Sequence, residues 1–148
     1  MIKPTQLRIG NLVTLSEKIR KHMWYNHIHA ENHFFDVQTI YSDNDVALQL
    51  DEEIVDLSQE DIEPIMLEKE WLRAFGAEIN SSNNYILDRF EFIWKEGYNY
   101  WYVLGEESST YLTKIEYVHE LQNFYFVMNG EDLVLLKEIG KEYLNKKS

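Results

Sequence analysis

Short strand patterns separated by turn residues fill the first 65 residues and restrict this half of the chain to a small β-rich fold. Short strands are predicted at 7–9, 12–15, 34–41, 46–50 and 54–55, and 34–41 is rich in aromatic and β-branched residues. Turns are indicated at Gly10-Asn11 and at 42–45, and a tight helical turn at 56–60. Four or five strands in about 65 residues favour a small SH3-like β-barrel.

Two amphipathic helices are expected in the second half. Segments 67–75 and 119–128 carry apolar residues at helical spacing, and a glycine follows each at positions 76 and 130. The tail, 131–148, is expected to form a further helix, although 133–136 could equally form a strand. One or two C-terminal helices are therefore predicted.

A three-stranded antiparallel meander is expected between these helices. Its strands are predicted at 86–94, 98–104 and 110–118. The first would place Ile86, Phe90, Phe92 and Trp94 on one face. The chain is thus predicted to be α+β, with a barrel-like subdomain at 1–66 and an α+β subdomain at 67–148, packed as one compact unit.

Acidic residues are concentrated in one segment. The chain carries a net charge of -12, and residues 36–70 contain twelve acidic side chains against one lysine, Lys69. Duplex nucleic acid would be repelled there, because phosphate binding needs Lys and Arg. We expect a solvated acidic face. It could bind a basic protein partner, with Asp51, Glu52 and Glu53 as candidate contacts, or act as a DNA mimic.

Basic residues near the N-terminus leave nucleic-acid binding as an alternative. Arg8, Lys18, Arg20 and Lys21 lie in a mildly basic segment that could contact phosphates through the small barrel. The charge of the whole chain makes this alternative weaker than protein binding.

Histidines offer the most suggestive metal ligands, but no metal site or cofactor is predicted. His27, His29 and His33, with His22 nearby, are weak zinc or nickel candidates. They lack HExxH spacing, and the chain has no cysteine. His119 could act as a general base, but no nucleophile motif or phosphate loop accompanies it. We expect it to cap the second helix or bond a neighbouring strand, and we expect no enzymatic activity.

Alternating tyrosines mark the best candidate binding surface. Tyr98, Tyr100 and Tyr102 would share one face of the second meander strand, with Trp101 and Val103 on the other. Tyrosine is enriched at protein interfaces because it offers a large area with a polar end. We therefore predict an interface with a protein partner, and a homodimer is compatible with it.

Targeting and membrane signals are missing from the sequence. No apolar run approaches the roughly 18 residues of a transmembrane helix, and the first residues lack a signal-peptide core. A soluble cytoplasmic protein without membrane contact is expected.

Three stretches stand in order along the chain: LRIGNLV at 7–13, IEPI at 62–65 with Leu67 and EWL at 70–72, and YVHELQN at 117–123 followed by Tyr125-Phe126. Together they resemble a family of small, uncharacterised phage and prophage-type proteins of gut bacteria. The family has no established activity, so the resemblance implies no catalytic residues. The sequence and the resemblance together favour a non-enzymatic accessory protein that binds another protein.

Overall fold

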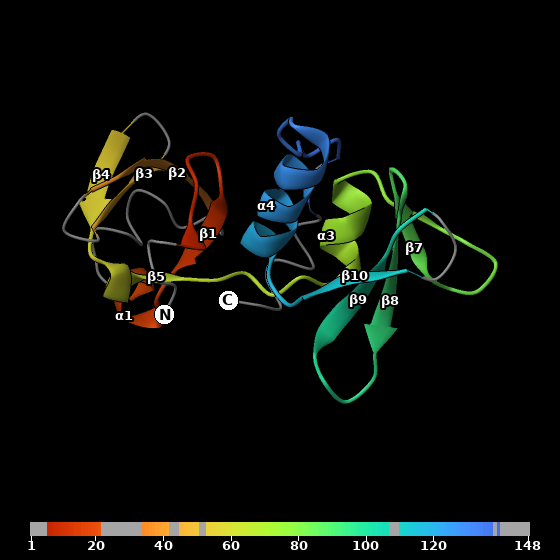
Figure 1. The fold of residues 1–148 in the computed structure, drawn as a ribbon. Coiled ribbons are helices and arrows are strands. Elements are labelled where there is room, and N and C mark those ends of the chain that lie inside the picture. The colour runs from red at the N-terminus through yellow and green to blue at the C-terminus, as the bar shows by residue number, and fades with distance from the viewer. Residues whose placement is uncertain are drawn as a thin grey trace. The chain divides into compact units, whose positions relative to one another are not determined.

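The fold comes from a computed structural model and comprises two units, residues 1–65 and 66–148. The structure describes residues 6–21, 34–41, 45–50, 53–106, 110–137 and 139. In Figure 1 the first unit runs from red to yellow and the second from green to blue. The fold is mixed α+β and consists mostly of β-sheet, with few helices.

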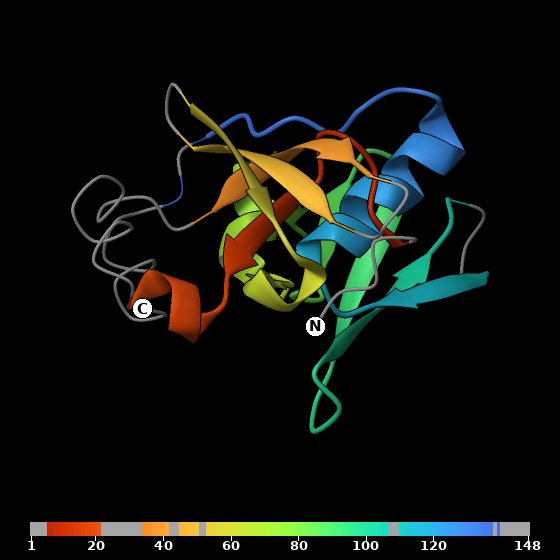
Figure 2. The same ribbon diagram turned by 90° about the vertical axis from the view of Figure 1, so that its left-hand side faces the viewer.

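The first unit is built on one five-stranded antiparallel sheet, ordered β4-β3-β2-β1-β5. The sheet curls like half a barrel (Figure 2). Its elements are β1 (Leu12–Leu15), α1 (Glu17–Arg20), β2 (Phe35–Ile40), β3 (Val46–Leu50), β4 (Glu53–Leu57), the 3-10 helix η2 (Gln59–Asp61) and β5 (Ile62–Glu63). The expected strands at 12–15, 34–41, 46–50 and 54–55 and the expected helical turn are confirmed.

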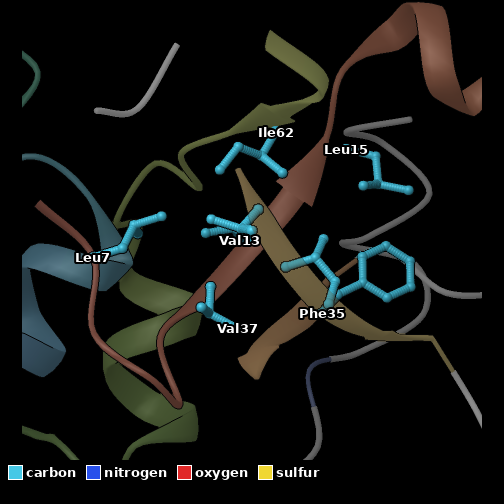
Figure 3. Close-up of a cluster of buried hydrophobic side chains, with 8 residues drawn as sticks. Leu7, Val13, Leu15, Phe35, Val37 and Ile62 are labelled. Atoms are coloured by element: carbon cyan, nitrogen blue, oxygen red, sulfur yellow. The ribbon is translucent and has the colours of Figure 1, made fainter. Parts of the chain in front are cut away.

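Apolar side chains from four strands form the core of this unit. Figure 3 shows Val13 of β1 with Val37 of β2 and Ile62 of β5 around it. The three side chains are fully buried. Burying one such side chain stabilises the folded state by roughly 1.5–3 kcal/mol. The apolar positions of the strands predicted from the sequence thus form the core of this unit.

The predicted strand at 7–9 is wrong, because this segment forms a turn. Asn11 Oδ1 accepts a hydrogen bond from the Arg8 backbone N–H at 2.7 Å, and the Asn11 N–H donates back to the Arg8 carbonyl. Gly10, with a φ of 91°, donates its N–H to the Val37 carbonyl. The segment therefore leads into β1 without pairing as a strand.

The second unit also contains a five-stranded antiparallel sheet, ordered β10-β9-β8-β7-β6. Its elements are α3 (Lys69–Ala74), β6 (Glu78–Ile79), β7 (Tyr85–Leu87), β8 (Phe90–Lys95), β9 (Tyr100–Leu104), β10 (Tyr111–Ile115) and α4 (Val118–Asn129). All neighbouring strands are antiparallel, so the expected meander is present, with two more strands than predicted.

The predicted single strand at 86–94 is wrong, because a two-residue turn divides it. Asp88 adopts a φ of 55°, and the chain reverses at Asp88-Arg89 between β7 and β8. Tyr85 pairs with Phe92, and Ile86 with Glu91. Ile86 therefore lies on the opposite face from Phe92, because strand neighbours alternate between faces.

The inner face of this sheet carries the aromatic core of the second unit. Trp101 is buried and donates its indole N–H to the Leu67 carbonyl at 2.7 Å. The expected apolar face of the first helix is also buried, at Leu67, Trp71, Leu72 and Phe75. Gly76 follows α3 with a φ of 103°, which confirms the expected stop.

The second predicted helix is confirmed as α4, and Gly130 ends it in the left-handed conformation with a φ of 72°. The C-terminal helix predicted for 131–148 is wrong for residues 131–137, which have neither helical nor strand structure. The Leu136 and Lys137 N–H groups donate to the Ala74 carbonyl at the end of α3, at 2.8 and 3.0 Å. The backbone of this stretch therefore caps another helix.

Candidate functional site

Tyrosines cover the outer face of β9, as the alternation predicts. Tyr100 and Tyr102 are half-buried on this face, whereas Trp101 and Val103 are buried on the other. The tyrosines pair with Lys95 and Ile93 of β8, and Trp101 pairs with Trp94. Both views show that the β8–β9 hairpin extends beyond α3 and α4 (Figures 1 and 2). The outer tyrosines are therefore presented on a projecting hairpin.

Four tyrosine rings form a continuous row, which we call the tyrosine row: Tyr98, Tyr100, Tyr102 and Tyr111. Successive ring centroids lie 5.8, 5.3 and 5.6 Å apart. The last two contacts are edge-to-face, a favourable arrangement for aromatic pairs. Tyr98 and Tyr111 are 63% and 54% exposed, so both ends of the row are open to solvent.

Tyr111 joins the row from the neighbouring strand, β10. It pairs with Leu104 of β9, and the register shifts between Tyr111 and Thr113. A β-bulge adds one residue to one strand and redirects the side chains that follow. Strict alternation therefore cannot assign Tyr111 to a face from sequence.

The ammonium groups of two lysines lie beside the rings of the tyrosine row. The Lys95 ammonium lies 5.9 Å from the ring centroid of Tyr98 and 5.6 Å from that of Tyr102. The Lys114 ammonium lies 5.1 Å from the ring centroid of Tyr100. These distances are within the cation–π range, and exposed contacts of this kind contribute about 0.5–1 kcal/mol each. The surface is thus both aromatic and locally cationic.

Neighbouring hydroxyl groups couple the centre of the row. The hydroxyls of Tyr100 and Tyr102 lie 3.2 Å apart and share a hydrogen bond. This bond to Tyr102, followed by desolvation, raises the pKa of Tyr100 to about 12. Tyr100 is therefore neutral at physiological pH and offers its hydroxyl as a donor or acceptor.

His119 occupies a structural position rather than the helix cap that the sequence suggests. It is 4% exposed, and its ring stacks on Tyr117 at a centroid distance of 5.9 Å. The helix is capped by Glu120, whose Oε1 accepts the N–H groups of Glu116 and Tyr117 at 3.0 Å each. Of the two roles expected for His119, capping the helix is therefore wrong, and a bond to a neighbouring strand stays a prediction.

Burial makes His119 a poor base. Desolvation lowers its pKa to about 4. Its Nδ1 atom is buried and has no hydrogen-bond partner within the described part of the chain. A general base works best with a pKa near the operating pH and with a partner within reach. This environment supports a role in packing.

The described acidic residues of the first unit differ in their contacts and positions. Asp56 accepts a hydrogen bond from the Tyr41 hydroxyl at 2.9 Å, and Asp61 accepts the backbone and side chain of Ser58. Glu53 and Asp56 are exposed on β4, three positions apart, and so lie on opposite faces. This distribution gives no support to a single phosphate-like row. Asp51 and Glu52 lie outside the described residues.

The basic candidates of the first unit fall within the described residues, whereas the histidine candidates do not. Arg8 and Arg20 are half-buried, and Lys21 pairs with Glu17 at 2.6 Å on α1. His22, His27, His29 and His33 lie outside the described residues. Among the residues that are described, no group of three or more His, Asp or Glu side chains could hold a metal ion.

No helix in the described ranges is long and apolar enough to cross a membrane. Comparison of the chain with models of protein families finds no match. Comparisons with curated proteins and with solved structures find none either. The resemblance to phage-type proteins and the expected function therefore stay predictions. The residues described above are the basis for proposing a function.

Proposed function

We propose that this protein is a non-enzymatic protein-binding module that contacts an acidic segment of its partner through the tyrosine row. The observation that carries the proposal is the unbroken series of four tyrosine rings flanked by Lys95 and Lys114. A phage-type accessory role and an SH3-like first unit are consistent with the proposal.

The tyrosine row has the properties of an interface hot spot. Binding energy concentrates in a few residues, and tyrosine is enriched among them. Each ring of the row already contacts its neighbour, so little side-chain freedom remains to be lost when a partner binds. The phenol hydroxyls supply polar contacts at the same place.

The positive charge beside the tyrosine row favours a partner with acidic side chains. Lys95 and Lys114 both lie beside the central tyrosines, on β8 and β10 respectively. Opposite charges across an interface increase the association rate and exclude wrong partners. Carboxylate side chains on a partner would meet the ammonium groups while their neighbours pack on the rings.

Charge reversal tests this proposal. The chain is immobilised, proteins of its source organism are captured, and each captured protein is quantified for the wild type and for Lys95→Glu/Lys114→Glu. We expect at least one acidic protein to be retained by the wild type and lost from the variant. Lys18→Glu/Lys137→Glu is the matched control, because it changes two exposed lysines outside the row and has the same net charge.

Equal retention of every captured protein by the reversed and control variants would contradict the proposal. Thermal unfolding of both variants checks that they remain folded, which is expected because all four lysines are exposed.

A further inference from the structure

A groove opens on the second unit, on the face of the sheet opposite the tyrosine row. Its volume is about 420 Å³, within the range of pockets that hold small ligands and single side chains. Tyr85, Trp94 and Trp101 form one wall, and residues 68–70 at the start of α3 form the other. No part of the function proposed above uses this groove.

The aromatic wall is rigid. Trp101 is held by its 2.7 Å hydrogen bond to the Leu67 carbonyl. The ring of Trp94 lies 5.1 Å from that of Trp101, and Tyr85 meets Trp101 edge-on at 5.8 Å. Trp94 is 36% exposed, although the structure packs the other two rings away from solvent. A partly exposed indole ring therefore lies beside two buried rings in the lining of the groove.

The opposite wall is acidic. Glu68 and Glu70 line the groove together with Lys69, so carboxylates outnumber ammonium groups on this rim. Arg73, one turn further along α3, places its guanidinium 5.6 Å from the ring centroid of Tyr85. The chain's own Arg73 thus already makes a cation–π contact with this wall.

We propose that the groove binds the guanidinium of an arginine side chain presented by a partner protein. A planar guanidinium stacks on indole faces and also forms paired hydrogen bonds to carboxylates, whereas a lysine ammonium does so less well. Trp94 supplies the exposed ring for stacking, backed by the buried Trp101, and Glu68 and Glu70 supply the carboxylates. The arginine proposed for the groove is opposite in charge to the acidic segment proposed for the tyrosine row. The two sites would therefore bind different ligands.

NMR titration of the full chain with three short peptides tests this site. The probes are acetyl-Gly-Arg-Gly-amide, the same peptide with neutral citrulline, and the same peptide with lysine. We expect saturable shifts of the Trp94 and Trp101 indole resonances with the arginine peptide, weaker binding of the lysine peptide, and no saturation with citrulline. Equal binding of citrulline, or lysine binding as tightly as arginine, would overturn the assignment.

Two variants locate the binding. Trp94→Ala removes a partly exposed ring and should abolish the saturable shift, while Glu68→Gln/Glu70→Gln should weaken the affinity about tenfold. Glu78→Gln/Glu131→Gln removes two exposed carboxylates elsewhere and should change the affinity by less than about twofold. Shifts that persist in Trp94→Ala, or equal losses in both Gln pairs, would contradict the site. None of these outcomes depends on the tyrosine row.

Discussion

At the scale of single residues, hydrogen bonding and burial shift the pKa values of two side chains, and each shift has a measurable consequence. The hydrogen bond to Tyr102 raises the pKa of Tyr100, and desolvation lowers the pKa of His119. The first belongs to the proposed interface, whereas the second belongs to the packing of α4.

The hydroxyl pair in the tyrosine row should be visible in a titration. We expect ¹³C NMR of the ring carbons to give a pKa of about 12 for Tyr100. Tyr102→Phe removes the hydrogen-bond partner and should lower that pKa towards the ordinary value of 10.0. Tyr125→Phe, on α4, is the control and should leave it unchanged. An unshifted Tyr100 in the wild type would show that the hydroxyl pair does not form.

Burial of His119 should make the protein less stable in mild acid. The pKa of His119 is lower in the folded state, about 4, than in the unfolded state, about 6.5. Above pH 6.5, His119 therefore leaves the free energy of unfolding unchanged. As the pH falls from 6.5 towards 4, that free energy decreases progressively, because only the unfolded chain takes up the proton. The loss should reach about 3 kcal/mol.

Urea unfolding of the wild type and of His119→Gln between pH 7 and 4 measures this term. The other titrating groups cancel in the difference between the two proteins, so the variant should lose less free energy of unfolding on acidification. Parallel pH dependences would mean that His119 does not remain neutral in the folded state.

At the scale of elements, helix ends in the second unit are completed by distant backbone and side-chain groups. Arg89, in the β7–β8 turn, donates to Asn129 Oδ1 at 2.7 Å and to the Met128 carbonyl at 3.1 Å. The end of α3 is completed by the N–H groups of Leu136 and Lys137. These contacts join segments that are far apart in sequence.

Removing the contact between the β7–β8 turn and α4 should weaken the second unit. Arg89→Ala loses two charge-assisted hydrogen bonds at a helix C-terminus, and we expect the free energy of unfolding to fall by about 1 kcal/mol because the site is exposed. Lys137→Ala is the control, since Lys137 bonds to the Ala74 carbonyl through its backbone N–H, which the substitution keeps. Equal stabilities of the two variants in urea would refute the role of Arg89.

A side chain at Gly76 should destabilise the second unit. Its φ of 103° is unfavourable for other residues, and an added Cβ would lie 2.7 Å from Leu136 Cδ1. Gly76→Ala should therefore lower the free energy of unfolding by about 1–3 kcal/mol. Adding Leu136→Ala should recover the steric part while the backbone part remains. A Gly76→Ala protein as stable as the wild type would contradict this packing.

The same elements explain what could be predicted from the sequence. Alternation placed Tyr100 and Tyr102 opposite Trp101 correctly, because a regular strand has a period of two. The turn at Asp88 was missed, since a non-glycine residue adopts a positive φ there. Residues 131–137 were misassigned as a helix because their partner, the Ala74 carbonyl, lies far away in sequence.

At the scale of the whole molecule, opposite charges lie in different parts of the sequence. Most of the charge of -12 comes from the segment that ends with Glu68 and Glu70, while the tyrosine row carries Lys95 and Lys114. The groove was not anticipated from sequence, because Trp94 and Trp101 are brought together by strand pairing and Glu68 by the start of α3. The central claim is that the tyrosine row binds an acidic segment of a partner protein.

The most direct test of that claim is the dissociation constant of the captured acidic partner, measured by calorimetry for three forms of the protein. Tyr100→Ala/Tyr102→Ala should weaken binding at least about thirtyfold, because each hot-spot tyrosine contributes more than about 1 kcal/mol. Ile79→Ala/Val127→Ala, which shortens two exposed apolar side chains outside the row, should leave the affinity unchanged. An unchanged affinity of the folded tyrosine variant would contradict the account.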